Sequence, residues 1–429
     1  MMAQNLALDW SKRMSRILDV YLHQKHSGQL IQDDSGRLIF TYDETYVAED
    51  RLSLSLSLPL RHEPYEGNNV KAFFSGLLPD NIVRHRLARY LGVSEKNPFS
   101  LLEAIGGECA GALSLYPEGA IPPEAKEEDA ETLDDHKLKE ILELLKRRPL
   151  LAGEEGLRLS LAGAQDKIAV GVKDGKIALV KGTTPTTHIL KPLIAEVKDS
   201  VHNELFCLRL AKLVGIETPH AEIRTVNDTS YFLIERYDRI RDKSGQIHRL
   251  HQEDFCQALG IMPDMKYERE GGPSLTKCQA ILGQFSAKPA VDQMSLLERV
   301  IFNYLIGNAD AHGKNFSLLY KEKKPELAPA YDLLSTAVYP DFSVKMAMKI
   351  GGTYEPEHVF LRHWHRLVPD MMATTRNIER QLLHMSKDCG EKAYELKTSC
   401  EKEGLRSSVF EDICTLVSKR IHHIKEQVF

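Results

Sequence analysis

The order of the strand and helix patterns along the chain constrains its fold more than any other feature of the sequence. Strand patterns with a few short helices dominate as far as residues 231–234, and the pattern beyond about Leu250 is helical almost to the end. A strand pair expected at residues 316–320 and 327–331 interrupts the helical part. A strand-rich half followed by a helix-rich half predicts two lobes, and a cleft between lobes is a common place for a ligand.

In the first third, leucine alternates with serine over residues 52–58, which predicts a half-buried strand that Pro59 ends. Residues 82–91 predict a helix, and clustered glycines predict a turn before a strand at 112–116. Residues 122–135 are rich in Asp and Glu and poor in large apolar residues. They predict a solvated, mobile linker, which a short helix at 138–145 follows.

The middle of the chain predicts three strands, at residues 168–172, 177–180 and 188–191, with a hairpin turn at 173–176 between the first two. A helix at 201–214, ended by Gly215, and a strand at 231–234 follow. The fold class predicted from this order is α+β. We divide the chain into a strand-rich subdomain (1–135), the rest of the first lobe (136–240) and a helical second lobe (241–429).

Composition excludes several other classes of protein. Of the 429 residues, 42% are hydrophobic and 27% are charged, which is typical of a globular chain. No apolar run approaches the roughly 20 residues of a membrane span, so no membrane partner is expected. The seven cysteines are odd in number and lack CxxC spacing, which favours reduced thiols in the cytoplasm over a zinc site. The net charge of -5 predicts poor binding of the isolated chain to DNA.

The strongest chemical pattern lies in residues 308–315, Asn-Ala-Asp-Ala-His-Gly-Lys-Asn, followed by Asp332. Phosphoryl transfer needs a carboxylate beside the attacking hydroxyl and oxygen ligands for magnesium. Protein kinases place the base five residues before a metal-binding Asn and a metal-binding Asp further on. Asp310 and Asn315 have that spacing, and the predicted strand pair would return Asp332 beside Asn315. The alternative is a plain turn, since these residue types are common in turns.

Three upstream features fit the same chemistry. Residues 160–167, Ser-Leu-Ala-Gly-Ala-Gln-Asp-Lys, are small enough for backbone N–H groups to approach phosphate oxygens, although they match neither a Walker A motif nor GxGxxG. Lys191 ends a predicted strand, and Glu204 on the next helix could anchor it. Residues 235–239 stand where a hinge would meet adenine. Taken singly, each has a plainer reading: a small-residue turn, a solvated lysine, a surface charge, a charged loop.

With these residues assembled, the chain resembles the HipA family of toxin–antitoxin serine/threonine kinases over roughly residues 16–420. The likeness rests on the segments above and on four others, at residues 52–59, 74–81, 105–112 and 252–255. It implies a bilobed protein-kinase-like fold with an extra strand-rich N-terminal subdomain and an all-helical C-terminal lobe. The first 15 residues precede the family pattern, and we expect them to form a short helix or to fray.

The resemblance also implies roles for individual residues. Asp310 would be the catalytic carboxylate, Asn315 and Asp332 the Mg²⁺ ligands, and Ser160 an autophosphorylation site that silences the enzyme. The residues expected to hold ATP are Ala162, Gly163, Ala164, Gln165, Lys167, Lys191, Glu204, Glu235, Tyr237, Asp238, His312 and Lys314.

The partners implied by the family are a helix-turn-helix antitoxin similar to HipB, operator DNA bound through that antitoxin, and a protein substrate such as glutamate–tRNA ligase. Two alternatives remain open from the residues. One is a small-molecule phosphotransferase, which a deep acidic pocket beside Asp310 would favour. The other is a catalytically silent co-repressor, against which the intact set of Lys191, Asp310, Asn315 and Asp332 speaks.

Overall fold

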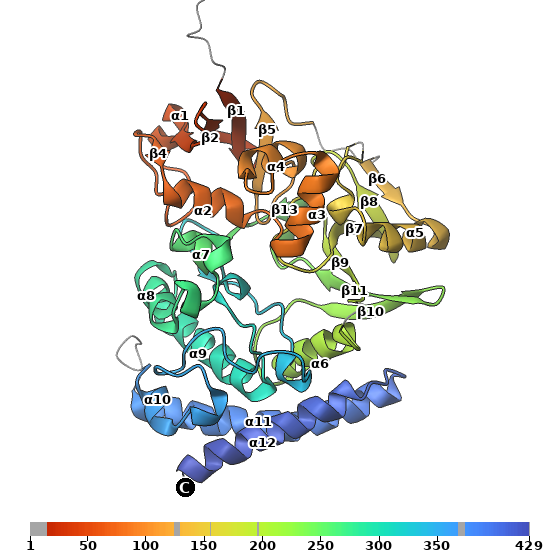
Figure 1. The fold of residues 1–429 in the computed structure, drawn as a ribbon, viewed down its shortest axis with the longest axis vertical. Coiled ribbons are helices and arrows are strands. Elements are labelled where there is room, and N and C mark those ends of the chain that lie inside the picture. The colour runs from red at the N-terminus through yellow and green to blue at the C-terminus, as the bar shows by residue number, and fades with distance from the viewer. Residues whose placement is uncertain (1–14, 124–128, 155, 195–196, 368–373, 429) are drawn as a thin grey trace, which may run out of the picture.

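The computed structural model describes residues 15–123, 129–154, 156–194, 197–367 and 374–428. All but the last of the 15 leading residues and part of the expected linker, residues 124–128, lie outside the described ranges. Figure 1 shows a strand-rich part in the upper half of the view and a helical part below it. The predicted two-lobed α+β fold is confirmed.

The N-terminal subdomain is a five-stranded antiparallel sheet in the order β4-β3-β2-β1-β5, with four helices packed around it. Its strands are β1 (Arg16–Leu22), β2 (Lys25–Gln32), β3 (Leu38–Tyr42), β4 (Tyr65–Glu66) and β5 (Leu113–Pro117). Its helices are α1 (Glu44–Ala48), α2 (Asn68–Gly76), α3 (Asn81–Leu91) and α4 (Pro98–Ile105). The helix expected at 82–91 is therefore confirmed as α3, which ends at Gly92 in the left-handed conformation (φ 69°) that glycine favours.

The strand predicted at residues 52–58 was wrong. Leu54 and Leu58 are buried as the alternation requires, but the backbone forms a turn closed by a hydrogen bond from Leu58 N to Ser55 O at 3.1 Å. The carboxylate of Glu253 accepts hydrogen bonds from the Ser55 hydroxyl and from Leu56 N. Tyr42 of the N-terminal subdomain receives Leu54 N and donates to Leu58 O, so backbone groups of this turn are satisfied from both lobes and no neighbouring strand is needed.

A second sheet, in the order β10-β11-β9-β7-β8-β6, forms the rest of the first lobe. Its strands are β6 (Ala130–Thr132), β7 (Ile168–Lys173), β8 (Lys176–Val180), β9 (His188–Pro192), β10 (Ala221–Val226) and β11 (Thr229–Glu235). Lys173 pairs with Lys176, so the expected hairpin is confirmed. The linker predicted at 122–135 was wrong for residues 130–132, which form β6. This short polar strand pairs with β8 at the edge of the sheet, a position that such a strand tolerates. Helix α5 (Asp135–Leu145) follows β6.

The second lobe is mostly helical. Its helices are α7 (Phe255–Ala258), α8 (Leu275–Phe285), α9 (Pro289–Ile306), α10 (Leu361–His365), α11 (Thr375–Lys402) and α12 (Val409–Val428), and α6 (Ser200–Leu213) packs against them. In Figure 1, α11 and α12 run side by side beneath α9 and α6. One large apolar cluster fills this lobe and another fills the strand-rich part. All seven cysteines are free and buried.

Strands that the sequence did not predict lie at the start of the second lobe, which was expected to be helical apart from one strand pair. A hairpin, β12 (Arg239–Arg241) with β13 (Ile247–Arg249), follows the first lobe. A three-stranded sheet then joins β14 (His251–Asp254), β15 (Ser317–Tyr320) and β16 (Glu326–Leu327). The predicted pair at 316–320 and 327–331 is present, but its second strand is only two residues long. Within the described residues, no helix has the length and apolar character needed to cross a membrane.

Candidate active site

The end of α9 positions the loop that carries Asp310. The helix stops at Gly307, which adopts the left-handed conformation (φ 71°) that glycine favours. A Cβ there would also lie 2.5 Å from the end of the Leu416 side chain. Beyond it, the Asn308 side chain receives the backbone N–H of Asp310 at 3.1 Å. These local constraints fix where the Asp310 carboxylate leaves the backbone.

Asn315 and Asp332 are brought to the same loop by the strand pair. The amide of Asn315 donates to the backbone oxygen of Asp310 at 3.1 Å. Tyr331 donates its hydroxyl to Lys314 O at 2.8 Å, which ties the segment after β16 to the catalytic loop. Asp332 itself has φ 56°, a strained value for a residue with a side chain, and such strain is concentrated at functional sites.

Lys191, at the end of β9, reaches across the cleft. Its ammonium lies 2.7 Å from Glu204 on α6 and 3.5 Å from Asp332. Lys191 and Glu204 are buried, whereas the Asp332 side chain is 45% exposed. The pair predicted from the sequence is therefore formed, and it holds Lys191 within reach of whatever Asp332 binds.

The surroundings shift the pKa values of these groups in different directions. Burial lowers the pKa of Lys191, but Glu204 and Asp332 outweigh it, and the net pKa is raised. Although burial opposes it, the nearby Lys191 and Lys167 hold the pKa of Asp332 below its ordinary value. Burial raises the pKa of Asp310. Burial, with help from Lys191, lowers the pKa of Lys167 to about 8.

Residues 160–167 form a loop over the same cleft. Gly163 adopts φ 110°, and the Lys167 ammonium donates to Ala162 O at 2.8 Å, which curls the loop around its own lysine. The Ser160 side chain is buried and donates to Leu77 O at 2.7 Å. Asp80 N donates to Gly163 O at 3.0 Å, so the segment after α2 holds the first half of this loop through Leu77 and Asp80.

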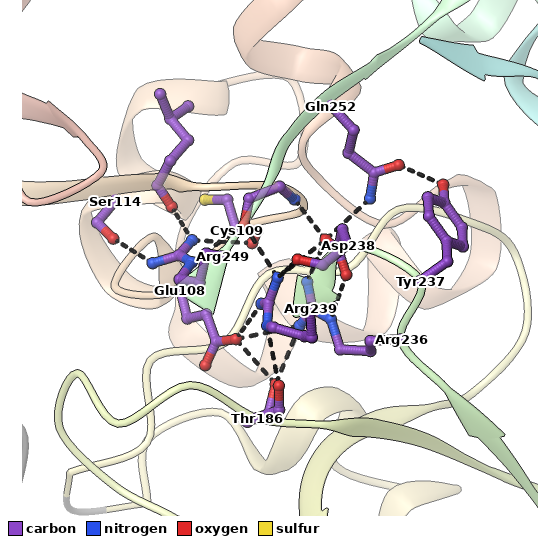
Figure 2. A network of polar contacts seen from close by, with 12 residues as sticks. Glu108, Cys109, Ser114, Thr186, Arg236, Tyr237, Asp238, Arg239, Arg249 and Gln252 are labelled. Carbon is purple, nitrogen blue, oxygen red and sulfur yellow. Dashed lines mark hydrogen bonds and ion pairs between the residues drawn. The ribbon is translucent and has the colours of Figure 1, made fainter. Parts of the chain in front are cut away.

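The hinge between the lobes is held by a network of buried charges, drawn in Figure 2. Glu108, from the N-terminal subdomain, accepts hydrogen bonds from Arg236 (3.1 Å) and Arg239 (2.6 Å). Asp238 receives two hydrogen bonds from Arg236, at 3.0 and 2.9 Å. Arg249 donates to three backbone carbonyl oxygens and to Ser114 in the same subdomain. The hinge backbone is thereby fixed to the N-terminal subdomain.

A single cavity of about 830 Å³ connects these parts. It is lined by every site residue predicted from the sequence except Ser160. Two of the lining residues are already paired with other charges. Arg236 neutralises Asp238, and Asp80 neutralises Lys314 at 2.6 Å. The structure therefore brings the predicted residues together, and it shows that Asp238 and Lys314 are engaged in ion pairs within the protein.

Three charged or polar residues at the site escaped the sequence interpretation: Asp80, Lys266 and Tyr267. Asp80 contacts the ammonium groups of Lys314 and Lys266, the latter at 3.3 Å. The Tyr267 hydroxyl donates to Asp310 Oδ1 at 2.5 Å. Asp80 stands in the 74–81 segment that supports the family likeness, whereas nothing in the sequence around Lys266 and Tyr267 indicates a role.

The cavity contains the chemical groups that phosphoryl transfer requires. Carboxylate and amide oxygens of Asp332 and Asn315 suit Mg²⁺, which proteins hold by few ligands together with substrate phosphates. Among the described residues, no cluster of three or more His, Cys, Asp or Glu side chains is suited to hold a metal by itself. Buried His312 lines the cavity, and its Nδ1 makes no hydrogen bond to any described residue.

Comparison with known proteins agrees with this geometry. The family description HipA-like C-terminal domain matches residues 159–393, and HipA N-terminal domain matches residues 18–116. The chain belongs to the HipA family. The HipA-like match begins just before the 160–167 loop, so both halves of the cleft lie within it.

Individual relatives support the same assignment. A protein of Sinorhizobium fredii named as a kinase, Y4mE, is 49% identical over 340 residues, which cover 78% of this chain and 81% of the relative. The serine/threonine-protein kinase toxin HipA of Shewanella oneidensis is 33% identical over 358 residues, 80% of each chain. The solved complex of Shewanella oneidensis HipA with HipB and operator DNA matches with a TM-score of 0.82 at 26% identity, over 96% of this chain and 98% of that one.

Proposed function

We propose that this protein is a magnesium- and ATP-dependent serine/threonine protein kinase and the toxin of a toxin–antitoxin module. The observation that carries the proposal is the convergence of Asp310, Asn315, Asp332 and the Lys191–Glu204 pair on one cavity. Membership of a family with a named serine/threonine kinase toxin supports it.

The residues present fit magnesium–ATP. The cavity has room for a nucleotide, the backbone at Glu235 and Tyr237 borders it, and the unpartnered Nδ1 of buried His312 points to a polar ligand. Lys191 and Lys167 would hold phosphate oxygens, and Asn315 and Asp332 would hold the metal. When bound, ATP would supply an activated phosphoryl group, and the magnesium ion would neutralise the negative charge of the phosphates.

The chain's own residues would do the remaining work. Asp310 orients the acceptor hydroxyl and takes its proton, for which a raised pKa makes it a better proton acceptor. Glu204 keeps Lys191 extended into the cleft at 2.7 Å. The 160–167 loop covers the phosphates and excludes water.

Ser160 is the proposed site of self-inactivation. Its hydroxyl is buried against Leu77 O, so a phosphate of about -1.5 to -2 charges cannot be accommodated in the present position. The modified loop would have to leave its place beside Asp80 and would no longer hold ATP. The nucleotide affinities of phosphorylated and unmodified protein, measured by calorimetry with magnesium, should therefore differ. Equal affinities would rule out this switch.

The partners follow from the solved relative. A HipB-like helix-turn-helix antitoxin would bind this chain and join it to operator DNA as a co-repressing complex, because the solved relative is a HipA, HipB and operator complex. The net charge of -5 leaves DNA binding to that antitoxin. We place the protein in the cytoplasm and keep glutamate–tRNA ligase as a candidate substrate.

The decisive experiment is a phosphoproteome after brief induction of the protein, with Asp310→Gln as the inactive control. New phosphoserine or phosphothreonine on a small set of proteins, absent from the control, would identify the substrate. Purified protein that transfers phosphate only to a small molecule would favour a small-molecule phosphotransferase instead. The cavity lining carries acidic side chains such as Asp80 and Asp332 as well as basic ones such as Lys191 and Lys266, so this experiment has to decide between the two.

A further inference from the structure

The carboxylate of Asp310 has a partner that no sequence motif contains. Tyr267 lies on the connection from α7 to α8, and its hydroxyl donates to Asp310 Oδ1 at 2.5 Å. No described residue forms a hydrogen bond to Oδ2 of Asp310. One carboxylate oxygen is therefore engaged by the protein, and the other is left for an acceptor hydroxyl.

The connection that carries Tyr267 is fixed at several points. The backbone oxygen of Tyr267 accepts hydrogen bonds from Glu270 N (2.9 Å) and Gly272 N (3.0 Å). Gly272 permits this close approach, because a Cβ there would lie 2.4 Å from Met265 O. The following residue, Glu268, donates its N–H to Ala347 O at 3.1 Å. The phenol is thus presented by a well-anchored turn.

The preceding residue, Lys266, ties the same turn to both walls of the cleft. Its ammonium lies 3.3 Å from Asp80 in the N-terminal subdomain, and its backbone oxygen accepts from Gly313 N at 3.3 Å in the catalytic loop. The Tyr267 ring packs edge-on against His312, with centroids 5.2 Å apart at 86°. Backbone and ring contacts thus fix the hydroxyl relative to Asp310.

We propose that Tyr267 is a positioning residue for phosphoryl transfer, which orients the Asp310 carboxylate so that its free oxygen faces the acceptor hydroxyl. Burial and the negative charge of Asp310 raise the pKa of the Tyr267 phenol, so it remains a proton donor at neutral pH. This inference rests on the proposed kinase function, because Tyr267 acts only through Asp310. Tyr267 contributes alignment in the transition state and little to nucleotide binding.

The test compares full-length wild type, Tyr267→Phe, Asp310→Gln and the matched control Tyr320→Phe. Tyr320 also donates to a buried carboxylate, that of Glu253 at 2.5 Å, but this carboxylate holds the turn at residues 52–58 through Ser55 and Leu56 N and has no proposed part in phosphoryl transfer. The measurements are kcat for phosphate release and self-phosphorylation with magnesium–ATP, the Kd of magnesium–ATP by calorimetry, and the thermal unfolding midpoint. Tyr267→Phe keeps the ring and its packing on His312 and removes only the hydroxyl.

We expect Tyr267→Phe to lower kcat about tenfold, the typical effect of one hydrogen bond to a charged group, with Kd changed less than about twofold. Tyr320→Phe should leave kcat near wild type and lower the unfolding midpoint at least as much as Tyr267→Phe. An unchanged kcat, or a Kd that weakens in step with kcat, would overturn the positioning role. A faster Tyr267→Phe would also overturn it and would show that the phenol occupies the place of the acceptor hydroxyl.

The proposed function fails separately. Wild type without magnesium–ATP turnover, or Asp310→Gln as fast as wild type, would overturn the kinase assignment and this inference with it. Normal turnover by wild type, loss in Asp310→Gln and no change in Tyr267→Phe would overturn the role of Tyr267 alone.

Discussion

Two clusters of charged side chains border the nucleotide-sized cavity, and they differ in how fully their hydrogen bonds are satisfied. In the hinge network, Glu108 and Asp238 are each bound by two arginines, and both side chains are at most 6% exposed. In the catalytic cluster, the Asp332 side chain is 45% exposed, and one oxygen of Asp310 has no partner among the described residues.

The pKa values follow the same division. Burial alone would raise the pKa of Glu108 and of Asp238, but the arginines outweigh it and lower both. For Asp310, burial dominates and the pKa is raised. The carboxylates of the hinge network have all their charge paired with arginines, whereas the carboxylates of the catalytic cluster keep oxygens that can still bind a ligand. This comparison leads to the following predictions.

The largest effect is expected for Asp310→Gln, which replaces the proposed base with an uncharged amide. Phosphoryl transfer should fall by about 10²–10⁴-fold, the usual contribution of a positioned base. Calorimetry should show nearly unchanged magnesium–ATP binding, since the base contributes little to the ground-state complex. Near-normal turnover by this variant would show that the roles are assigned wrongly.

Glu108→Gln should act on stability instead. It leaves the buried Arg236 and Arg239 short of one negative charge, which typically costs about 3–5 kcal/mol of folding free energy. Denaturant unfolding measures this, with turnover followed at a temperature where the variant is folded.

The matched control for that change is Glu103→Gln. Glu103 pairs with Arg16 at the surface, where both side chains are more than a third exposed, and such a pair contributes only about 0–1 kcal/mol. Equal losses from Glu108→Gln and Glu103→Gln would contradict the division between the two clusters.

Asp332→Asn should weaken magnesium–ATP binding by roughly 10–100-fold, because it removes an anionic metal ligand and a partner of Lys191. Titration with magnesium at fixed ATP should separate metal affinity from nucleotide affinity. If only kcat changed and binding survived, Asp332 would not be a metal ligand.

The smallest effect concerns pH. With a pKa of about 8, Lys167 is mostly protonated at pH 7 and loses its charge as the pH rises through 8. Affinity for magnesium–ATP should therefore fall by about tenfold or less between pH 7 and 9, since one cation near the phosphates is lost. Lys167→Arg, whose guanidinium stays charged, should bind with little change over this range. An equal decline in both proteins would place the titrating group elsewhere.

Much of the fold and the site was predictable because it is encoded locally. The hairpin between β7 and β8, helix α3 and the end of α6 near Gly215 follow from short patterns. The relation between Asp310 and Asn315 is set within one loop. The strand expected at 52–58 shows the limit, because Leu54 and Leu58 are buried while Glu253, about 200 residues later, binds the backbone.

The sequence by itself determined the family, the two-lobed fold and many of the residues that line the cavity, since short motifs carry their own geometry. Only the tertiary structure decided which of the charged residues among them are neutralised by a partner within the protein. Asp80 neutralises Lys314 across a separation of 234 residues, and Glu108 binds Arg236 across 128. Tyr267 meets Asp310 through a turn with no recognisable pattern. Such contacts depend on how the lobes pack, and no local spacing encodes them.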